Sequence, residues 1–157
     1  MNDALFNAIR NGDNRSLSSL LKNDAELVNA KDPRGSTPLL LATYYGSEDI
    51  TETLLQYPQD LNTQDGSGNT ALMGVCFKGF ENIAKKLIDH GADVNITNFN
   101  GASALIFAAT FGRTNMVKLL LDHGADPGIK DDSGNTALDH ARMQELKEVI
   151  ALLEKNG

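Results

Sequence analysis

The chain has 157 residues, of which 41% are hydrophobic and 22% charged, and its formal net charge is −7. That length fits a single domain with a sizeable core, and the composition is not that of a disordered chain. The acidic balance disfavours non-specific nucleic-acid binding, which depends on neutralising phosphates. A lone cysteine excludes an internal disulfide, and no apolar run approaches the roughly 20 residues that span a bilayer. The polar N-terminus lacks the apolar stretch of a secretion signal. We therefore expect a soluble cytoplasmic protein that binds neither nucleic acid nor membrane.

A period of 33 residues runs through the chain. Four segments align without gaps, and they begin at Gly35, Gly68, Gly101 and Gly134. The same offset relates the hydroxyl residues Thr37, Thr70, Ser103 and Thr136. One further step back gives a degenerate first copy that contains Phe6, Ile9, Leu17 and Leu21. The period predicts five repeats, at 1–31, 32–64, 65–97, 98–130 and 131–157.

Each repeat is predicted to be a turn followed by two helices. The turn contains a glycine, and a Thr or Ser two residues later can cap the first helix. That helix is short and apolar, and it is expected to end at Gly46, Gly79 or Gly112. The second helix starts near Glu48, Glu81 or Asn115 and carries apolar residues at helical spacing. Neither helix can bury its apolar face alone, so neighbouring copies are expected to share a continuous core.

Three segments match a known repeat pattern: D-P-R-G-S-T-P-L-L-L-A at 32–42, H-G-A-D-V-N at 90–95 and H-G-A-D at 123–126. With the 33-residue period, they make the chain resemble the ankyrin repeat family over essentially its whole length. The resemblance implies a single domain over 1–157, an all-α solenoid of about five stacked helix-turn-helix repeats with turn tips. It implies a scaffold for protein binding, so the particular function has to be argued from the site.

The chain departs from the family pattern at several positions. Tyr57-Pro58-Gln59-Asp60 replaces H-G-A-D, which predicts a different loop at that helix end. Gly74 lies inside a first helix, at a cost of ~1 kcal/mol relative to Ala. Two explanations stay open for it: room for Phe107 of the next repeat, or simple drift. The histidine of the family tetrapeptide T-P-L-H is replaced by Leu40, Met73, Ile106 and Asp139. The hydrogen bonds of that histidine are therefore expected to be missing or replaced.

The two ends of the chain are expected to cap the stack. The first copy lacks the turn-plus-Thr signature, and the last copy has Glu145 where the three central copies have Gly46, Gly79 and Gly112. The last copy then continues with a polar helix, and terminal repeats need such a polar outer face. These features favour a complete protein.

The residue types that usually carry catalysis or bind metals have structural explanations here. His90 and His123 are equivalent residues before Gly, where a histidine can contact the last carbonyls of a helix. Asp139 and His140 resemble half of a catalytic pair, but adjacent helical residues point about 100° apart and no nucleophile lies beside them. Cys76 is predicted to be a small buried hydrophobe. We predict no enzyme activity, no cofactor and no metal.

The family resemblance places partner contacts on a concave surface made by the turn tips and the exposed sides of the first helices. Five of the nine Phe and Tyr residues fall at these positions, and aromatics are enriched at binding hot spots. The predicted partner-binding residues are Arg34, Tyr44, Tyr45, Phe77, Lys78, Phe99, Asn100 and Phe111. A competing interpretation is that Tyr44, Phe77 and Phe111 pack between neighbouring first helices and only complete the core.

The sequence thus predicts a monomeric, non-catalytic protein–protein interaction module that binds an unidentified partner protein through its concave face. The first alternative is a structural or self-associating subunit. The second, less favoured, is an enzyme whose site the sequence does not reveal.

Overall fold

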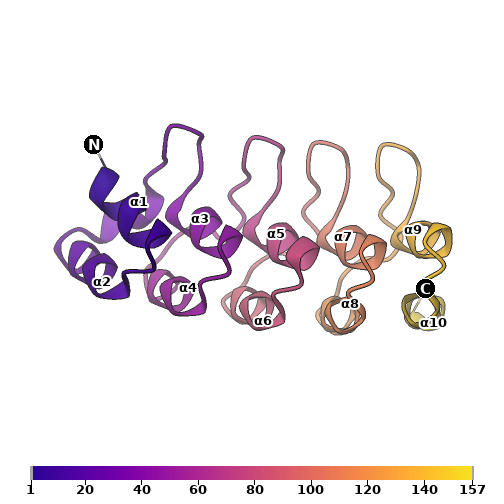
Figure 1. Ribbon diagram of the computed structural model, residues 1–157. Coiled ribbons are helices and arrows are strands. Elements are labelled where there is room, and N and C mark those ends of the chain that lie inside the picture. Colours follow the sequence, from indigo (N-terminus) through magenta and orange to yellow (C-terminus); the bar gives the residue numbers. More distant parts are fainter. Residues whose placement is uncertain (1, 157) are drawn as a thin grey trace.

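The structure is a computed structural model that describes residues 2–156. Five helix pairs stand side by side in one row, with the two chain ends at opposite ends of it (Figure 1). The elements are α1 (Asp3–Arg10), α2 (Asn14–Asn23), the 3₁₀ helix η1 (Ala25–Asn29), α3 (Pro38–Tyr44), α4 (Glu48–Leu54), α5 (Ala71–Lys78), α6 (Glu81–Asp89), α7 (Ala104–Thr110), α8 (Thr114–Asp122), α9 (Ala137–Met143) and α10 (Lys147–Asn156). No β-strand occurs within residues 2–156, and the predicted all-α repeat stack is confirmed. None of these helices is both long enough and apolar enough to cross a bilayer.

The odd-numbered helices form one layer and the even-numbered helices form the other (Figure 1). Four hairpin-like turns project on the side of the odd layer, and we call residues 32–36, 65–69, 98–102 and 131–135 the first to fourth turn tips. In each turn tip the first residue donates its backbone N–H to the carbonyl of the fifth residue, at 2.9–3.0 Å. The side-chain oxygen of that first residue also accepts two backbone N–H groups; Asp65 Oδ1, for example, accepts from Ser67 and Asn69. These bonds stabilise the turns in the absence of the family histidine.

The predicted start and end signals of the first helices are confirmed. The hydroxyl groups of Thr37, Thr70, Ser103 and Thr136 each accept the backbone N–H three residues later, as N-cap residues do. The expected glycines follow these helices in the left-handed region, with φ of 70° at Gly46, 84° at Gly79 and 68° at Gly112. These signals therefore mark where α3, α5 and α7 begin and end, and where α9 begins.

The core lies between the two helix layers and extends along the whole stack in two clusters. Equivalent leucines of the first helices, Leu39, Leu72 and Leu105, are each at most 3% exposed. Buried apolar residues form one cluster over α1–α4 and a second that runs from α3 to α10, so the two clusters meet in the α3/α4 pair. Neighbouring pairs bury one another's apolar faces, as the repeat pattern predicted.

The α3/α4 pair is irregular, as the substitution of its H-G-A-D segment predicted. Helix α4 ends at Leu54 after seven residues, whereas α6 and α8 have nine. Gln59 Nε2 donates to the carbonyl oxygens of Leu54, at 2.6 Å, and Tyr57. The Gln59 side chain thus supplies hydrogen bonds to carbonyl groups at and just beyond the end of α4, which a longer helix would bond to its own backbone N–H groups.

Glu145 keeps the backbone conformation of the glycine it replaces. Its φ is +57°, and no other residue except glycine has positive φ among residues 2–156. A side chain in that region costs roughly 1–2 kcal/mol, so we expect Glu145→Gly to raise the free energy of unfolding by about 1 kcal/mol. Urea denaturation followed by circular dichroism measures the change. The control, Ala151→Gly within α10, is expected to lower it by a similar amount. A lower stability in Glu145→Gly would contradict this explanation of the turn.

Candidate functional site

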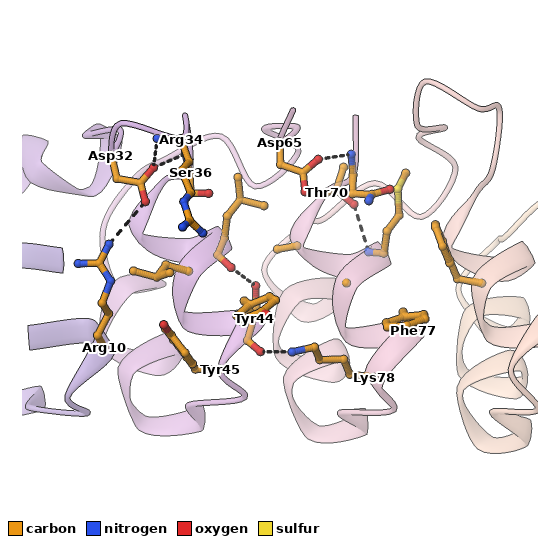
Figure 2. A pocket seen from close by; sticks show the side chains of 18 of the residues that line it. Arg10, Asp32, Arg34, Ser36, Tyr44, Tyr45, Asp65, Thr70, Phe77 and Lys78 are labelled. Atoms are coloured by element: carbon orange, nitrogen blue, oxygen red, sulfur yellow. Dashed lines mark hydrogen bonds and ion pairs between the residues drawn. The ribbon is translucent and has the colours of Figure 1, made fainter. Parts of the chain in front are cut away.

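A groove of about 830 Å³ runs along the turn-tip side of the second and third helix pairs. The first two turn tips form its upper walls, and the exposed sides of α3 and α5 form its floor (Figure 2). Five of the predicted binding residues line it: Arg34, Tyr44, Tyr45, Phe77 and Lys78. It is also lined by residues that the sequence analysis did not propose, among them Arg10, Asp32, Met73, Gly74 and Phe107. The groove therefore combines aromatic, aliphatic and charged groups from separate repeats.

The groove lies where two neighbouring turn tips are not joined to each other. The third turn tip is bonded to the second, because Phe99 N donates to Ser67 O at 3.2 Å. The fourth is bonded to the third by Asp132 N, which donates to Asn100 O at 3.0 Å. Within the described part of the chain, no hydrogen bond connects the first turn tip with the second. The first two turn tips therefore leave space between them.

The glycines of the turn tips show the same difference. A Cβ placed at Gly68 would lie 2.6 Å from the backbone nitrogen of Phe99, and one at Gly101 would lie 3.1 Å from that of Asp132. At Gly35 a Cβ would meet nothing within 4 Å. The residue in register with Phe99 in the second turn tip is Gly66, which has no side chain to cover its neighbour. The sequence therefore contains a local reason for the opening.

Four predicted aromatics form an exposed surface in and beside the groove. The exposed fractions are 61% for Tyr44, 49% for Tyr45, 43% for Phe77 and 47% for Phe111. Tyr44 and Tyr45 pack edge to face at 5.4 Å between ring centroids, and Phe77 and Phe111 do so at 4.7 Å. The interpretation that Tyr44, Phe77 and Phe111 only complete the core is wrong, because all three are substantially exposed. Phe111 extends the surface from α5 to the end of α7.

The Lys78 ammonium is held on the neighbouring repeat. Its Nζ donates to the carbonyl oxygen of Tyr44 at 2.7 Å and lies 3.6 Å from the centroid of the Tyr44 ring (Figure 2). The second contact is a cation–π interaction, worth roughly 0.5–1 kcal/mol at an exposed site. Lys78 therefore fixes the position of Tyr44 and joins the ends of α3 and α5.

The charges of the groove are unequally available to a ligand. Asp32 is nearly buried; its Oδ1 accepts the backbone N–H groups of Arg34 and Ser36, and its Oδ2 lies 3.8 Å from Arg10. Asp65 is used in the same way by the second turn tip. The Arg34 guanidinium, in contrast, has no hydrogen bond or ion pair with any residue in the range 2–156, and it points from the turn tip into the groove (Figure 2).

The remaining predicted residues lie outside the groove. Phe99 and Asn100 belong to the third turn tip, where Phe99 covers Gly68 and is still 67% exposed. Of the two explanations for Gly74, room for Phe107 is wrong, since a Cβ at Gly74 would have no atom of Phe107 or of any other neighbour within 4 Å. Gly74 instead leaves the groove floor open. The helix-interior glycine is the sequence signal that points to this hollow.

The histidines and the cysteine have the structural roles predicted for them. His90 Nδ1 lies 2.7 Å from Lys86 O, and His123 Nδ1 lies 2.9 Å from Leu119 O, in each case at a helix end. Cys76 is fully buried, and burial raises the pKa of its thiol far above the ordinary value. No group of three or more His, Cys, Asp and Glu side chains is placed to hold a metal ion in the described chain.

His140 pairs with Asp131 instead of Asp139. Its Nε2 lies 2.6 Å from Asp131 Oδ2, and Asp139 accepts the backbone N–H of Thr136 in a capping box. The hydrogen bond from His140, helped by backbone N–H groups of the fourth turn tip, holds the pKa of Asp131 below its ordinary value of 3.8. The backbone and hydroxyl contacts of Thr136 lower the pKa of Asp139. Both acids therefore stabilise the last repeat in their ionised form.

These two carboxylates predict a loss of stability in acid. A carboxyl group whose pKa is lower in the folded protein stabilises it above the ordinary pKa of 3.8, and this stabilisation disappears as the pH falls through the folded value. Urea titrations from pH 6 to 2.5 should show Asp131→Ala to be less stable than wild type by about 1–2 kcal/mol at pH 6, with the difference closing below pH 3.8. A difference that stays constant with pH would contradict this assignment.

Comparison with known proteins gives a consistent result. A family model described as ankyrin repeats (3 copies) matches residues 5–98 and, in a second match, residues 72–157. A stretch of 56 residues is 45% identical to protein fem-1 homolog C of Xenopus laevis, and this match covers 33% of the present chain. It covers 9% of that relative, so the present chain corresponds to a small part of it.

Proposed function

We propose, given that this chain belongs to the ankyrin repeat family, that it binds a partner protein through the concave face formed by its turn tips and odd-numbered helices. Ankyrin repeats are general protein–protein interaction modules, and the family is generally non-catalytic. The proposed contact residues are Arg34, Tyr44, Tyr45, Phe77, Lys78, Phe99, Asn100 and Phe111. The protein acts by occupying a surface of its partner.

The observation that carries this proposal is the exposed aromatic surface. Tyr44, Tyr45, Phe77 and Phe111 are each 43–61% exposed, although large apolar side chains are costly to leave in water. Contiguous exposed apolar patches mark interaction sites, and Tyr is among the residue types that dominate binding energy. The rings hold one another in place through edge-to-face contacts, so little side-chain entropy is lost when a partner binds.

Affinity capture from a lysate of the source cells tests the proposal. The triple variant Tyr44→Ala, Tyr45→Ala, Phe111→Ala should retain the circular dichroism spectrum of the wild type and lose at least nine-tenths of the captured partner, as measured by quantitative mass spectrometry. A control with three substitutions on the even-numbered helices, Lys85→Ala, Lys118→Ala and Glu148→Ala, should capture as much as wild type. Undiminished capture by the aromatic variant would overturn the proposed surface.

The alternative of a self-associating subunit is tested separately. We propose that the protein is cytoplasmic and monomeric. If it is a monomer, light scattering after size exclusion should give a mass near 16.9 kDa that does not change with concentration. A mass that rises with concentration in the wild type but not in the aromatic triple variant would show that the aromatic surface binds a second copy of the chain.

A further inference from the structure

We propose, resting on the function proposed above, that the groove between the first two turn tips selects a segment of the partner in which an acidic side chain neighbours an aromatic or large aliphatic one. The acidic group pairs with Arg34, and the apolar side chain enters the hollow above Gly74. This assignment names the chemistry of the partner, which the aromatic surface alone does not define.

The charge preference follows from which groups of the groove are already paired. Three cationic side chains line it, Arg10, Arg34 and Lys78, and two acidic ones, Asp32 and Asp65, so its local charge is 3 − 2 = +1 on a chain of net charge −7. Both carboxylates accept backbone N–H groups of their own turns. The carboxylates of Asp32 and Asp65 thus form hydrogen bonds within their own turns, and the cationic groups outnumber them. A carboxylate is the ligand group that complements this charge.

Arg34 is the cation with the most bonding capacity to offer. Lys78 is held against Tyr44, and Arg10 lies 3.8 Å from the Asp32 carboxylate. The Arg34 guanidinium has no partner within residues 2–156, and its planar fork can donate two parallel hydrogen bonds to one carboxylate. Of the three cations, Arg34 therefore has the guanidinium that is free of partners within residues 2–156.

The apolar preference follows from the floor. Gly74 is exposed inside α5, and a Cβ there would have no neighbour within 4 Å. Phe77 and Phe107 line the groove near this opening, and their rings pack edge to face at 6.4 Å between centroids. An inserted apolar side chain would cover these groups without displacing any of them. The missing side chains at Gly66 and Gly74 thus open the groove from the wall and from the floor.

The test uses the full chain and a phage-displayed library of random 12-residue peptides as the probe. We expect the selected peptides to be enriched in Asp or Glu next to Phe, Tyr, Leu or Ile. The synthetic form of a selected peptide should bind Arg34→Glu at least tenfold more weakly than wild type. Its affinity for the wild type should fall as the salt concentration rises. The matched control Lys118→Glu, the same kind of charge reversal on α8, should change the affinity less than twofold.

A second variant separates loss of the hollow from loss of folding. Gly74→Leu fills the hollow while removing a glycine from a helix, so its melting temperature should be at least that of the wild type. Its affinity for the selected peptide should nevertheless fall at least tenfold. If Gly74→Leu keeps both the melting temperature and the peptide affinity of the wild type, the apolar side chain does not bind above Gly74.

The outcomes distinguish this inference from the function on which it rests. Peptides without acidic enrichment, or peptides that bind Arg34→Glu as well as wild type, overturn the inference. If such peptides do not bind the aromatic triple variant, the proposed surface stands without the acidic preference. If they bind that variant normally, or if the library yields no binder, both proposals fail for this groove.

Discussion

Replacing Leu105 by Ala is expected to lower the free energy of unfolding by about 2–5 kcal/mol, which is a large part of the 5–15 kcal/mol typical of a whole domain. Leu105 is 1% exposed in the first turn of α7, and its truncation removes buried apolar surface and leaves a cavity. Helix α7 packs on α5 on one side and on α9 on the other, so the loss weakens two interfaces between neighbouring pairs. Urea denaturation followed by circular dichroism measures the effect.

The last repeat provides a matched control for Leu105. Leu138 occupies the same register in α9, but it is only half-buried, and among residues 2–156 no further helix pair packs on the outer side of α9. In a repeat array, stability is approximately a sum of the stabilities of the repeats and of the interfaces between neighbours. Leu138→Ala should therefore cost about 1 kcal/mol. Equal losses for the two variants would show that position in the stack does not determine the cost.

Most of the architecture is predictable because it depends on local signals that recur every 33 residues. A hydroxyl such as that of Thr70 caps a helix wherever its backbone permits, and a glycine such as Gly79 ends one by adopting a left-handed conformation. The apolar residues between these signals can be buried only against a neighbouring copy. The irregular loop at Tyr57–Asp60 is predictable for the same reason, since it is visible as a break in the repeat.

The groove is less predictable because it depends on the relation between repeats. The register predicts that Tyr44 and Tyr45 lie on the turn-tip side, but it does not predict whether a ring points outward or packs between helices. Lys78 is predicted as a partner-binding residue, and the structure shows its ammonium bound across the repeat boundary to Tyr44. Arg10 belongs to the degenerate first copy, where no repeat signal marks it as part of a site. Such contacts depend on the separation of neighbouring repeats, which the period does not specify.

The second and third turn tips are hydrogen-bonded to each other, whereas the first and second are not. This difference predicts a second large effect on the free energy of unfolding. Gly68→Ala is expected to lower the free energy of unfolding by about 2–4 kcal/mol. The residue has φ of +82°, where any side chain costs roughly 1–2 kcal/mol. The new Cβ would in addition lie 2.6 Å from the backbone nitrogen of Phe99, and that clash forces the third turn tip away from the second. Urea denaturation measures the loss.

The same substitution at Gly35 isolates the contact from the backbone strain. Gly35 has φ of +85°, but a Cβ there would meet nothing within 4 Å, so Gly35→Ala should cost only the roughly 1 kcal/mol of the left-handed conformation. The excess loss in Gly68→Ala then measures how tightly the third turn tip rests on the second, an interaction that the first two turn tips lack. Equal losses in the two variants would show that the contact between Gly68 and the third turn tip adds nothing to the cost of the left-handed conformation. The missing hydrogen bond between the first two turn tips would then no longer explain why the groove lies between the second and third helix pairs.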